Sequence, residues 1–467
     1  MIFRTLAFSI LLLTLTACNG GSSSPQTSPI SPPVQSLQSK LQGTWEQSGY
    51  GEIVVIEGTQ ATSYQFTRAT CVLGEVSSLQ DISNVELADN ENTFVISEAN
   101  SGFVQRFERI DALPDPCITP TGESPTELFE HVWHTFRERY AFFTERNVDW
   151  LAQYDAMRDQ INDEMTDNEL FIALATLILP IDDAHVSLVA DEDIAFSPAQ
   201  AKGVFRQLLD EFDNQDQFSD LDQYFDHALS QWTDNLIDTY LDEEVMAAGG
   251  PDNDMLLWGT IGTNIGYLRI DRMLVSEQSV DEQLIELAEV LDEVFTDLAD
   301  TTAMIVDIRI NQGGTDAIGL AIANRFADRE RMAVRKFARS ANGDTVAQEV
   351  LLQPIDGSAY LQPTVLITSG TTTSAAEVFA LAMREIPHVT HIGEPTNGSI
   401  SDALDKTLPN GWQFSLANEV YSGSDGIAFE AVGIRPDAET AVFDKNLRQI
   451  GQDSGLNTAL HLLDGNR

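Results

Sequence analysis

Residues 363–395 read PTVLITSGTTTSAAEVFALAMREIPHVTHIGEP and contain two strand-like runs separated by a turn and a helix. The β-branched run before Ser369 indicates a buried strand, and the small and apolar residues after Ser374 indicate a helix. Small hydroxyl residues fill the turn between them. Ser374 stands at the helix start, where a serine oxygen either caps the backbone N–H groups or faces a substrate beside them.

The same alternation runs outward through TNIGYLRI, AMIVDIRI, TDAIGLAIANRFA, PTVLITSG, SAAEVFALAMREI and VTHIGEP. It predicts an α/β core with a mainly parallel sheet and flanking helices. Active sites in such sheets gather at the carboxyl ends of the strands. Gly313-Gly314 stands at one such end, where paired glycines let backbone amides point into a cleft, as an oxyanion hole requires. A phosphate loop is the competing interpretation, but its lysine and spacing are absent.

The first eighteen residues, MIFRTLAFSILLLTLTAC, are typical of an export signal because a basic residue precedes a short apolar run. The close of this segment resembles a bacterial lipobox, in which Cys18 would carry the lipid; an ordinary signal peptide with a chance cysteine is the alternative. Residues 19–39 are rich in Ser and Pro and predict a flexible linker. We therefore expect an exported bacterial lipoprotein. The resemblance to bacterial lipoproteins implies the outer membrane, because Asn19 rather than an aspartate follows the cysteine, so the protein would lie on the periplasmic face of that membrane or at the cell surface.

Short alternating runs predict a small all-β domain over residues 40–118. In an oxidising compartment its two cysteines, Cys71 and Cys117, are a candidate disulfide, with two buried free thiols as the alternative. Residues 119–258 predict a helical cap and an acidic helical insertion. His131 and His134 lie three apart in the cap, but they lack a further close ligand set for a metal.

The net charge of −47, from 73 acidic and 26 basic residues, excludes nucleic acid as a partner because phosphates would be repelled. The acidic residues are spread along the chain, which indicates a solvated surface. No segment has the regular spacing of a calcium loop. We therefore expect no metal and no other cofactor.

Five motifs in order carry a resemblance to the tail-specific protease and tricorn-core family of serine peptidases: DDAHVSL, VDIRINQGG, TSGTTTSAAEVFA, IGEPTNGS and FEAVGIRPD. The resemblance covers about residues 124–440. It implies a ClpP/crotonase-like peptidase core over residues 259–447, followed by a C-terminal tail over 448–467. It also implies a peptide or unfolded-protein substrate.

The family divides by its catalytic base. One branch has a lysine about 25 residues after the serine, but Asn397-Gly398-Ser399 occupies that turn here, and Lys336 and Lys406 fall outside it. The tricorn-like branch uses a histidine from the cap and a glutamate late in the core. The resemblance therefore implies three catalytic residues: Ser374 as nucleophile, His185 as general base and acid, and Glu430 as supporting carboxylate.

The oxyanion donors implied by these positions are the amides of Gly314 and Ala375, with Gly313 as the fallback for Gly314. A histidine is suited to accept the serine proton because imidazole titrates near neutral pH. Asp307 and Arg309 are expected to brace the strand end.

Two departures from the family pattern stand out. Ala184 replaces the serine that precedes the histidine in tricorn-core members, and no PDZ-like segment separates cap from core. A binding protein for apolar small ligands, built on the same core, is the alternative function, and an esterase is a third. Cleavage specificity and oligomeric state are left open by the sequence.

Overall fold

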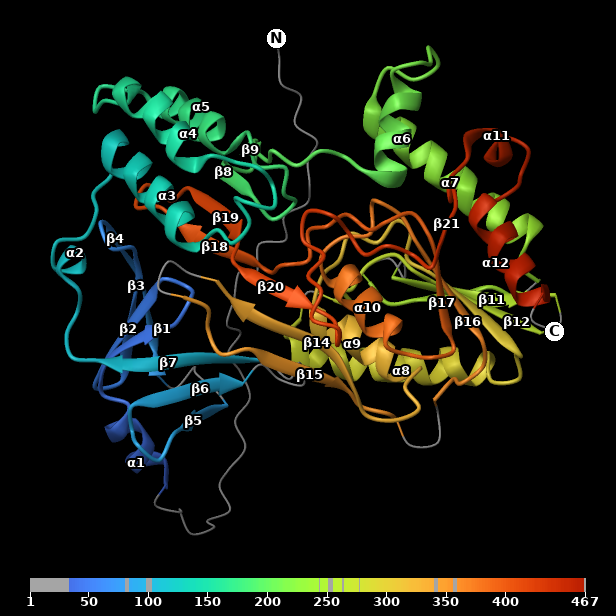
Figure 1. Ribbon diagram of the computed structural model, residues 1–467, viewed down its shortest axis with the longest axis horizontal. Helices are drawn as coiled ribbons and strands as arrows, with labels where there is room; N and C mark the ends of the chain where they lie inside the picture. The colour runs from blue at the N-terminus through green and yellow to red at the C-terminus, as the bar shows by residue number, and fades with distance from the viewer. Residues whose placement is uncertain are drawn as a thin grey trace, which may run out of the picture.

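The computed structural model describes residues 33–465 apart from 80–83, 98–102, 243, 251–254, 263, 277, 340–342 and 356–358. The expected signal segment 1–18, with Cys18, and residues 19–32 of the expected linker lie outside this description. Figure 1 shows the β domain and the cap at one end of the molecule and the α/β core at the other. None of the helices in the described ranges has the length and apolar character needed to cross a membrane.

A seven-stranded antiparallel sheet in the order β4-β3-β2-β1-β7-β6-β5 forms the N-terminal β domain. The domain has its own apolar centre, in which the ring of Phe94 meets Trp45 edge-on at 4.8 Å and stacks on Phe107 at 4.6 Å. Its elements are α1 (Pro33–Lys40), β1 (Gly43–Gln47), β2 (Glu52–Glu57), β3 (Gln60–Phe66), β4 (Cys71–Ser78), β5 (Val85–Leu87), β6 (Thr93–Ser97) and β7 (Val104–Ile110).

A disulfide joins Cys71 at the start of β4 to Cys117 of the short helix α2 (Asp115–Ile118). The two Cα atoms lie 4.9 Å apart, and both side chains are buried. The bond therefore ties the exit of the β domain back to its edge strand.

Cap and core share a four-stranded sheet in the order β18-β19-β8-β9. Its register places Leu188 of the cap opposite Phe414 of the core. The cap helices cover this sheet, with Phe136 and Trp150 in the same apolar cluster. The sheet therefore fixes the segment that carries His185 against the core. The elements are α3 (Pro125–Arg139), α4 (Trp150–Met157), a 3₁₀ turn (Arg158–Gln160), α5 (Asp167–Ile178), β8 (Ser187–Asp191), β9 (Ile194–Phe196), β18 (Ala403–Thr407) and β19 (Gln413–Ala417).

The acidic insertion consists of α6 (Gly203–Phe212) and α7 (Leu221–Thr239), which pack through aromatic rings such as Phe218 and Tyr224. The expected range 119–258 for cap and insertion ends inside a core strand. β10 (Met246–Ala248) and β11 (Leu256–Ile261) both join the core sheet. Apolar Leu256 and Leu257 are buried there, which is why this stretch pairs as a strand.

The core sheet has the order β10-β11-β12-β13-β16-β17-β21. In this sheet β12, β13, β16, β17 and β21 are parallel to one another, whereas β10 pairs antiparallel with β11 and β11 with β12. The carboxyl ends of β13 and β16 therefore meet at one edge, as the alternation in the sequence predicts. The remaining bounds are β12 (Ile265–Ile270), β13 (Ala303–Asp307), β16 (Thr364–Thr368), β17 (Val389–Gly393) and β21 (Ala438–Glu439).

Helices cover both faces of this sheet (Figure 1). Val306 and Leu366 pack with α8 (Val280–Asp297), α9 (Asp316–Asn324) and α10 (Ala375–Arg384). Ile305 and Ile367, on the opposite face, pack with residues of α7 and of α12 (Ser454–Gly465). The described part of the expected tail, residues 448–465, is therefore part of the core, because α12 supplies a buried apolar face to the sheet. A short helix α11 (Lys445–Arg448) precedes it.

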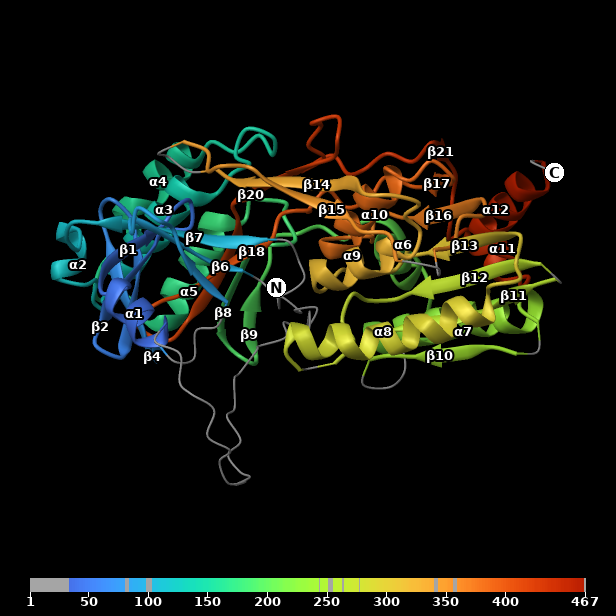
Figure 2. The same cartoon turned by 90° about the horizontal axis from the view of Figure 1, so that it is seen from below.

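A three-stranded sheet, β15-β14-β20, lies against α9 and α10 (Figure 2). Its strands are β14 (Arg331–Ala338), β15 (Gln348–Leu352) and β20 (Glu419–Ser422). Phe103 of the β domain meets Tyr421 of β20 with ring centroids 6.4 Å apart. This sheet thus connects the β domain to the helices that carry the candidate site.

Candidate active site

Ser374 occupies a strained turn between β16 and α10. Its φ of 58° and ψ of −130° place a non-glycine residue in a sparsely populated region, at a cost of about 1–3 kcal/mol. Its amide donates to the carbonyl oxygen of Ser399 at 3.0 Å, and its own carbonyl accepts the amide of Glu377 at 2.7 Å. These bonds hold the backbone in place and direct the hydroxyl toward the cap.

The Oγ of Ser374 lies 3.0 Å from Nε2 of His185. His185 precedes β8 and is held by its backbone: its amide donates to Asp183 Oδ1 at 2.9 Å, and its carbonyl accepts the Ser415 hydroxyl at 2.9 Å. Burial lowers the pKa of His185, although the charge of Asp183 opposes the shift. A neutral imidazole within hydrogen-bond reach of a serine hydroxyl can accept its proton.

Gly313 and Gly314 follow β13 and lie beside the nucleophile. A Cβ on Gly313 would come within 2.7 Å of the Ser374 Cβ and 3.1 Å of the Ala375 nitrogen, so only glycine fits this approach. The Gly313 amide donates to Asn311 Oδ1 at 2.8 Å and is therefore occupied. In the described part of the chain no acceptor bonds the amides of Gly314 and Ala375. Both remain available to a developing oxyanion.

Glu430 is buried near the site but does not contact His185. Its Oε1 accepts Arg146 Nη2 at 2.7 Å, and its Oε2 accepts the amides of Ile400 at 3.0 Å and Ser401 at 3.2 Å. Burial and the charge of Asp183 raise the pKa of Glu430, whereas Arg146 and the hydrogen bond from the Ile400 amide lower it. The guanidinium of Arg146 therefore lies between Glu430 and the part of the site that contains His185.

Three further residues adjoin the site that sequence reasoning missed: Asp183, Arg146 and Glu377. Glu377 is fully buried and accepts the amides of Gly398 at 2.8 Å and Ser399 at 3.0 Å, which ties α10 to the following turn. Burial raises the pKa of Glu377 to about 7. Its position three residues after a helix-start serine is a capping-box spacing, which could have drawn attention to it. Asp183 lies within the DDAH motif, two residues before His185, whereas Arg146 carries no local signal.

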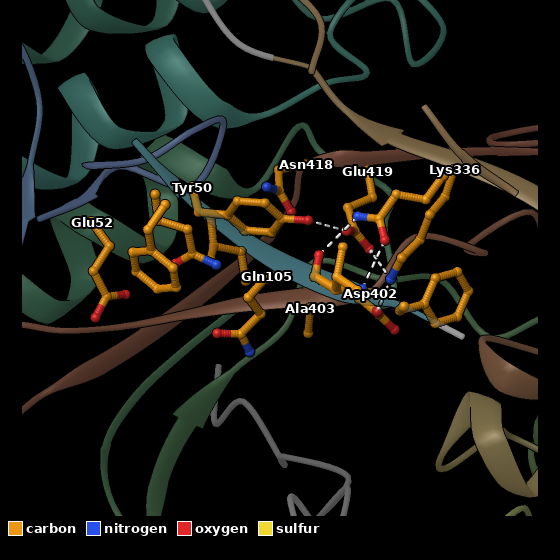
Figure 3. Close-up of a pocket in the computed structure, with 14 residues that line it drawn as sticks. Tyr50, Glu52, Gln105, Lys336, Asp402, Ala403, Asn418 and Glu419 are labelled. Atoms are coloured by element: carbon orange, nitrogen blue, oxygen red, sulfur yellow. Dashed lines mark hydrogen bonds and ion pairs between the residues drawn. The ribbon is translucent and has the colours of Figure 1, made fainter. Parts of the chain in front are cut away.

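Neither neighbouring lysine is bonded to Ser374 in the described part of the chain. Lys336 lines a cavity of about 360 Å³ between the β domain and the core, and Figure 3 shows its side chain beside Asp402 and Glu419. Its Nζ lies 3.1 Å from both Asp402 Oδ2 and Glu419 Oε2. Lys406 is buried, with its Nζ 4.0 Å from Glu52 Oε2, and burial lowers its pKa.

Two other candidate groups are structural. The Nη2 of Arg309 lies 2.7 Å from Asp307 Oδ2 and its Nη1 lies 2.8 Å from Asp453 Oδ2, with the arginine fully buried. It therefore braces the strand end through the C-terminal segment. His131 is buried with its Nδ1 2.9 Å from Thr70 Oγ1. Among the described residues no group of three His, Cys, Asp or Glu side chains could hold a metal ion.

Residues 264–440 match Peptidase family S41, and residues 122–178 match the Tricorn protease C1 domain. The core and the first part of the cap are thus domains of the tail-specific and tricorn-like protease family. This confirms the family resemblance inferred from the five motifs.

Two similar proteins illustrate the extent of the similarity. The carboxy-terminal processing protease CtpA of Bacillus subtilis (strain 168) is 24% identical over 168 residues, which is 35% of each protein. The chain thus aligns with about a third of the length of this curated relative. A putative peptidase from Parabacteroides merdae ATCC 43184 is 23% identical in sequence, with a TM-score of 0.58 over 73% of this chain and 97% of that one. This second similarity concerns the fold.

The structure brings some of the expected site residues together and separates others. Ser374, His185, Gly314 and Ala375 converge at the edge formed by β13 and β16. Glu430 reaches this group only through Arg146. Cys18 lies outside the described residues.

Proposed function

We propose that this protein is an exported serine peptidase that hydrolyses peptide bonds in peptides or unfolded proteins. The observation that carries the proposal is the 3.0 Å contact between Ser374 Oγ and His185 Nε2, beside two amides without acceptors. A nucleophile, a base and an oxyanion hole are the parts that acyl transfer by serine requires.

In this mechanism His185 accepts the hydroxyl proton while Ser374 Oγ attacks the scissile carbonyl carbon. The negative charge on the carbonyl oxygen is stabilised by the amides of Gly314 and Ala375, helped by the positive end of the α10 dipole. The imidazolium then donates its proton to the leaving amine. Water repeats the sequence on the acyl-enzyme and regenerates the serine. Glu430 supports the site as a buried carboxylate.

Labelling with a fluorophosphonate, followed by mass analysis of the modified peptide, tests this proposal. We expect modification at Ser374 and none in the Ser374→Ala and His185→Ala variants, with folding checked by circular dichroism. Folded wild-type protein that neither labels nor cleaves peptides would favour the alternative, a carrier of apolar small ligands.

We also propose that Cys18 anchors the protein to a membrane by lipid, at the periplasmic face of the outer membrane or at the cell surface. The support is the lipobox-like end of the signal segment and the polar linker behind it. Cys18→Ser should release the protein into the soluble fraction. Membrane attachment of that variant would contradict the anchor.

A further inference from the structure

The imidazole of His185 lacks the partner that a catalytic base requires. Because Nε2 must accept the Ser374 proton, Nδ1 carries the ring hydrogen before the reaction. Nδ1 is buried, and no hydrogen-bond partner reaches it within the described part of the chain. Ala184 supplies no hydroxyl, and its amide instead donates to Ser399 Oγ at 3.2 Å. Something other than residue 184 must therefore orient the ring.

The carboxylate closest to this nitrogen in the described structure belongs to Asp183. Its Oδ1 lies 4.0 Å from His185 Nδ1 and already accepts the His185 amide at 2.9 Å. Its Oδ2 accepts the Tyr140 hydroxyl at 2.8 Å and lies 3.1 Å from Arg146 Nε. Asp183 is fully buried, and its contacts with the His185 amide, the Tyr140 hydroxyl and Arg146 hold its charge next to the imidazole.

Arg146 extends this arrangement to Glu430. Its side chain is 4% exposed, and its Nη2 donates to Glu430 Oε1 at 2.7 Å and to the Gly398 carbonyl at 2.9 Å. One buried guanidinium thus lies between two buried carboxylates. The imidazolium that forms during catalysis adds a second positive charge beside Asp183, where a fixed carboxylate stabilises it most in a low-dielectric site.

We propose that Asp183 is the positioning residue that sets the tautomer and orientation of His185, and that Arg146 links Glu430 to it in place of the missing serine at position 184. This inference rests on the proposed function and deepens it. It assigns Glu430 an indirect role, exerted through Arg146, and gives Tyr140 the role of holding Asp183.

Several charged side chains shift the pKa of His185, and this pKa can be measured. Asp183, Asp402 and Asp405 favour the imidazolium, whereas Arg146 disfavours it. Asp402 and Asp405 are exposed on the solvent side, so salt screens them more than it screens the buried pair. Removing Asp183 or Arg146 should therefore move the His185 pKa in opposite directions, which a purely structural role would not produce.

The test is ¹⁵N NMR of the histidine rings in the full chain, with His185→Gln assigning the signal. In the wild type we expect a neutral ring protonated at Nδ1. Asp183→Asn should lower the His185 pKa because it removes the charge that favours the imidazolium, and Arg146→Gln should raise it. Asp183→Asn should also lower kcat at least tenfold, with KM changed less than twofold.

Two milder variants guard against loss of folding. Tyr140→Phe removes one hydrogen bond to Asp183 and should lower kcat severalfold and shift the ring signal. Ala184→Ser should leave activity unchanged, since the serine position is not used here. A folded Asp183→Asn or Tyr140→Phe variant with an unaltered ring signal would overturn the proposal, as would a tenfold gain in Ala184→Ser. Wild-type protein that fails to label at Ser374 would overturn the proposed function instead, while the NMR signal would still report on ring order.

Discussion

The oxyanion loop, Gly313-Gly314, can be tested against a third glycine, because all three have a backbone conformation that would strain an L-residue but they differ in their surroundings. Gly313, Gly314 and Gly343 have φ values of 103°, 140° and 110°, a region that L-residues rarely adopt. A Cβ on Gly314 would lie 2.3 Å from the Met273 carbonyl oxygen, whereas a Cβ on Gly343 would meet nothing within 4 Å. Gly314→Ala should therefore displace the loop, and Gly343→Ala serves as the matched control for backbone strain alone.

The magnitude follows from the contact distances. Ordinary contact begins at 3.4 Å, so the Gly314 and Met273 backbones must separate by about 1 Å. A displacement of that size, or the loss of one oxyanion donor, costs roughly 10²–10³ in kcat. Gly313→Ala crowds Ser374 directly and should be at least as severe. Gly343→Ala should cost about 1–3 kcal/mol of stability and leave kcat unchanged.

The assay is steady-state peptide hydrolysis, combined with thermal unfolding followed by circular dichroism. We expect Gly314→Ala and Gly313→Ala to be folded and nearly inactive, and Gly343→Ala to be active but less stable. The reasoning is refuted if folded Gly314→Ala retains kcat within threefold of the wild type. It is equally refuted if Gly343→Ala loses as much activity as Gly314→Ala, because strain rather than the site would then explain both.

Three other predictions concern the pH dependence of activity, the two buried lysines and the disulfide. Activity should rise with pH through the His185 pKa, which burial places below the usual 6.5, so a pH–rate profile of kcat/KM whose acidic limb lies above 6.5 would contradict the neutral imidazole. Lys406→Met should keep peptide hydrolysis and stability, since it removes a weakly paired buried cation, and a folded but inactive Lys406→Met variant would restore the lysine mechanism. Lys336→Met should lower the free energy of unfolding by about 3–5 kcal/mol, because Glu419 is left buried without its cation. Reducing the Cys71–Cys117 bond, whose cysteines are 46 residues apart, should cost about 4 kcal/mol in chemical denaturation, and free alkylation of both thiols in unreduced, denatured protein would exclude the bond.

At the level of sequence, Lys406 is expected to be a solvated lysine, which would stay protonated and could not accept the serine proton. In the structure Lys406 belongs to β18 and is buried, with its Nζ 4.0 Å from Glu52 Oε2 of the β domain. Lys406 is therefore excluded as the base by its location rather than by its protonation. A single sequence does not reveal this, because the burial depends on how the β domain docks on the core.

The sequence by itself determined the local parts of the site. The strand, turn and helix around Ser374 and the paired glycines after β13 are short-range features, set by β-branched runs, helix formers and the conformational freedom of glycine. The carboxyl ends of β13 and β16 meet because the strands are parallel, which the alternation of elements predicts. The ordered motifs then identify His185 as their partner, and the structure brings it within 3.0 Å of Ser374.

Only the tertiary structure decided how the charges around His185 are arranged. Arg146 lies 37 residues before Asp183 and 284 residues before Glu430, and no periodicity or motif connects positions so far apart. Their contact arises because the cap contributes two strands to a sheet that the core completes, which carries the loop after α3 onto the turn at Gly398. Residues 454–465 likewise form a helix in the tertiary structure because α12 packs on an apolar face of the core sheet. Burial of apolar surface between distant segments decides among local conformations that the sequence of each segment alone does not distinguish.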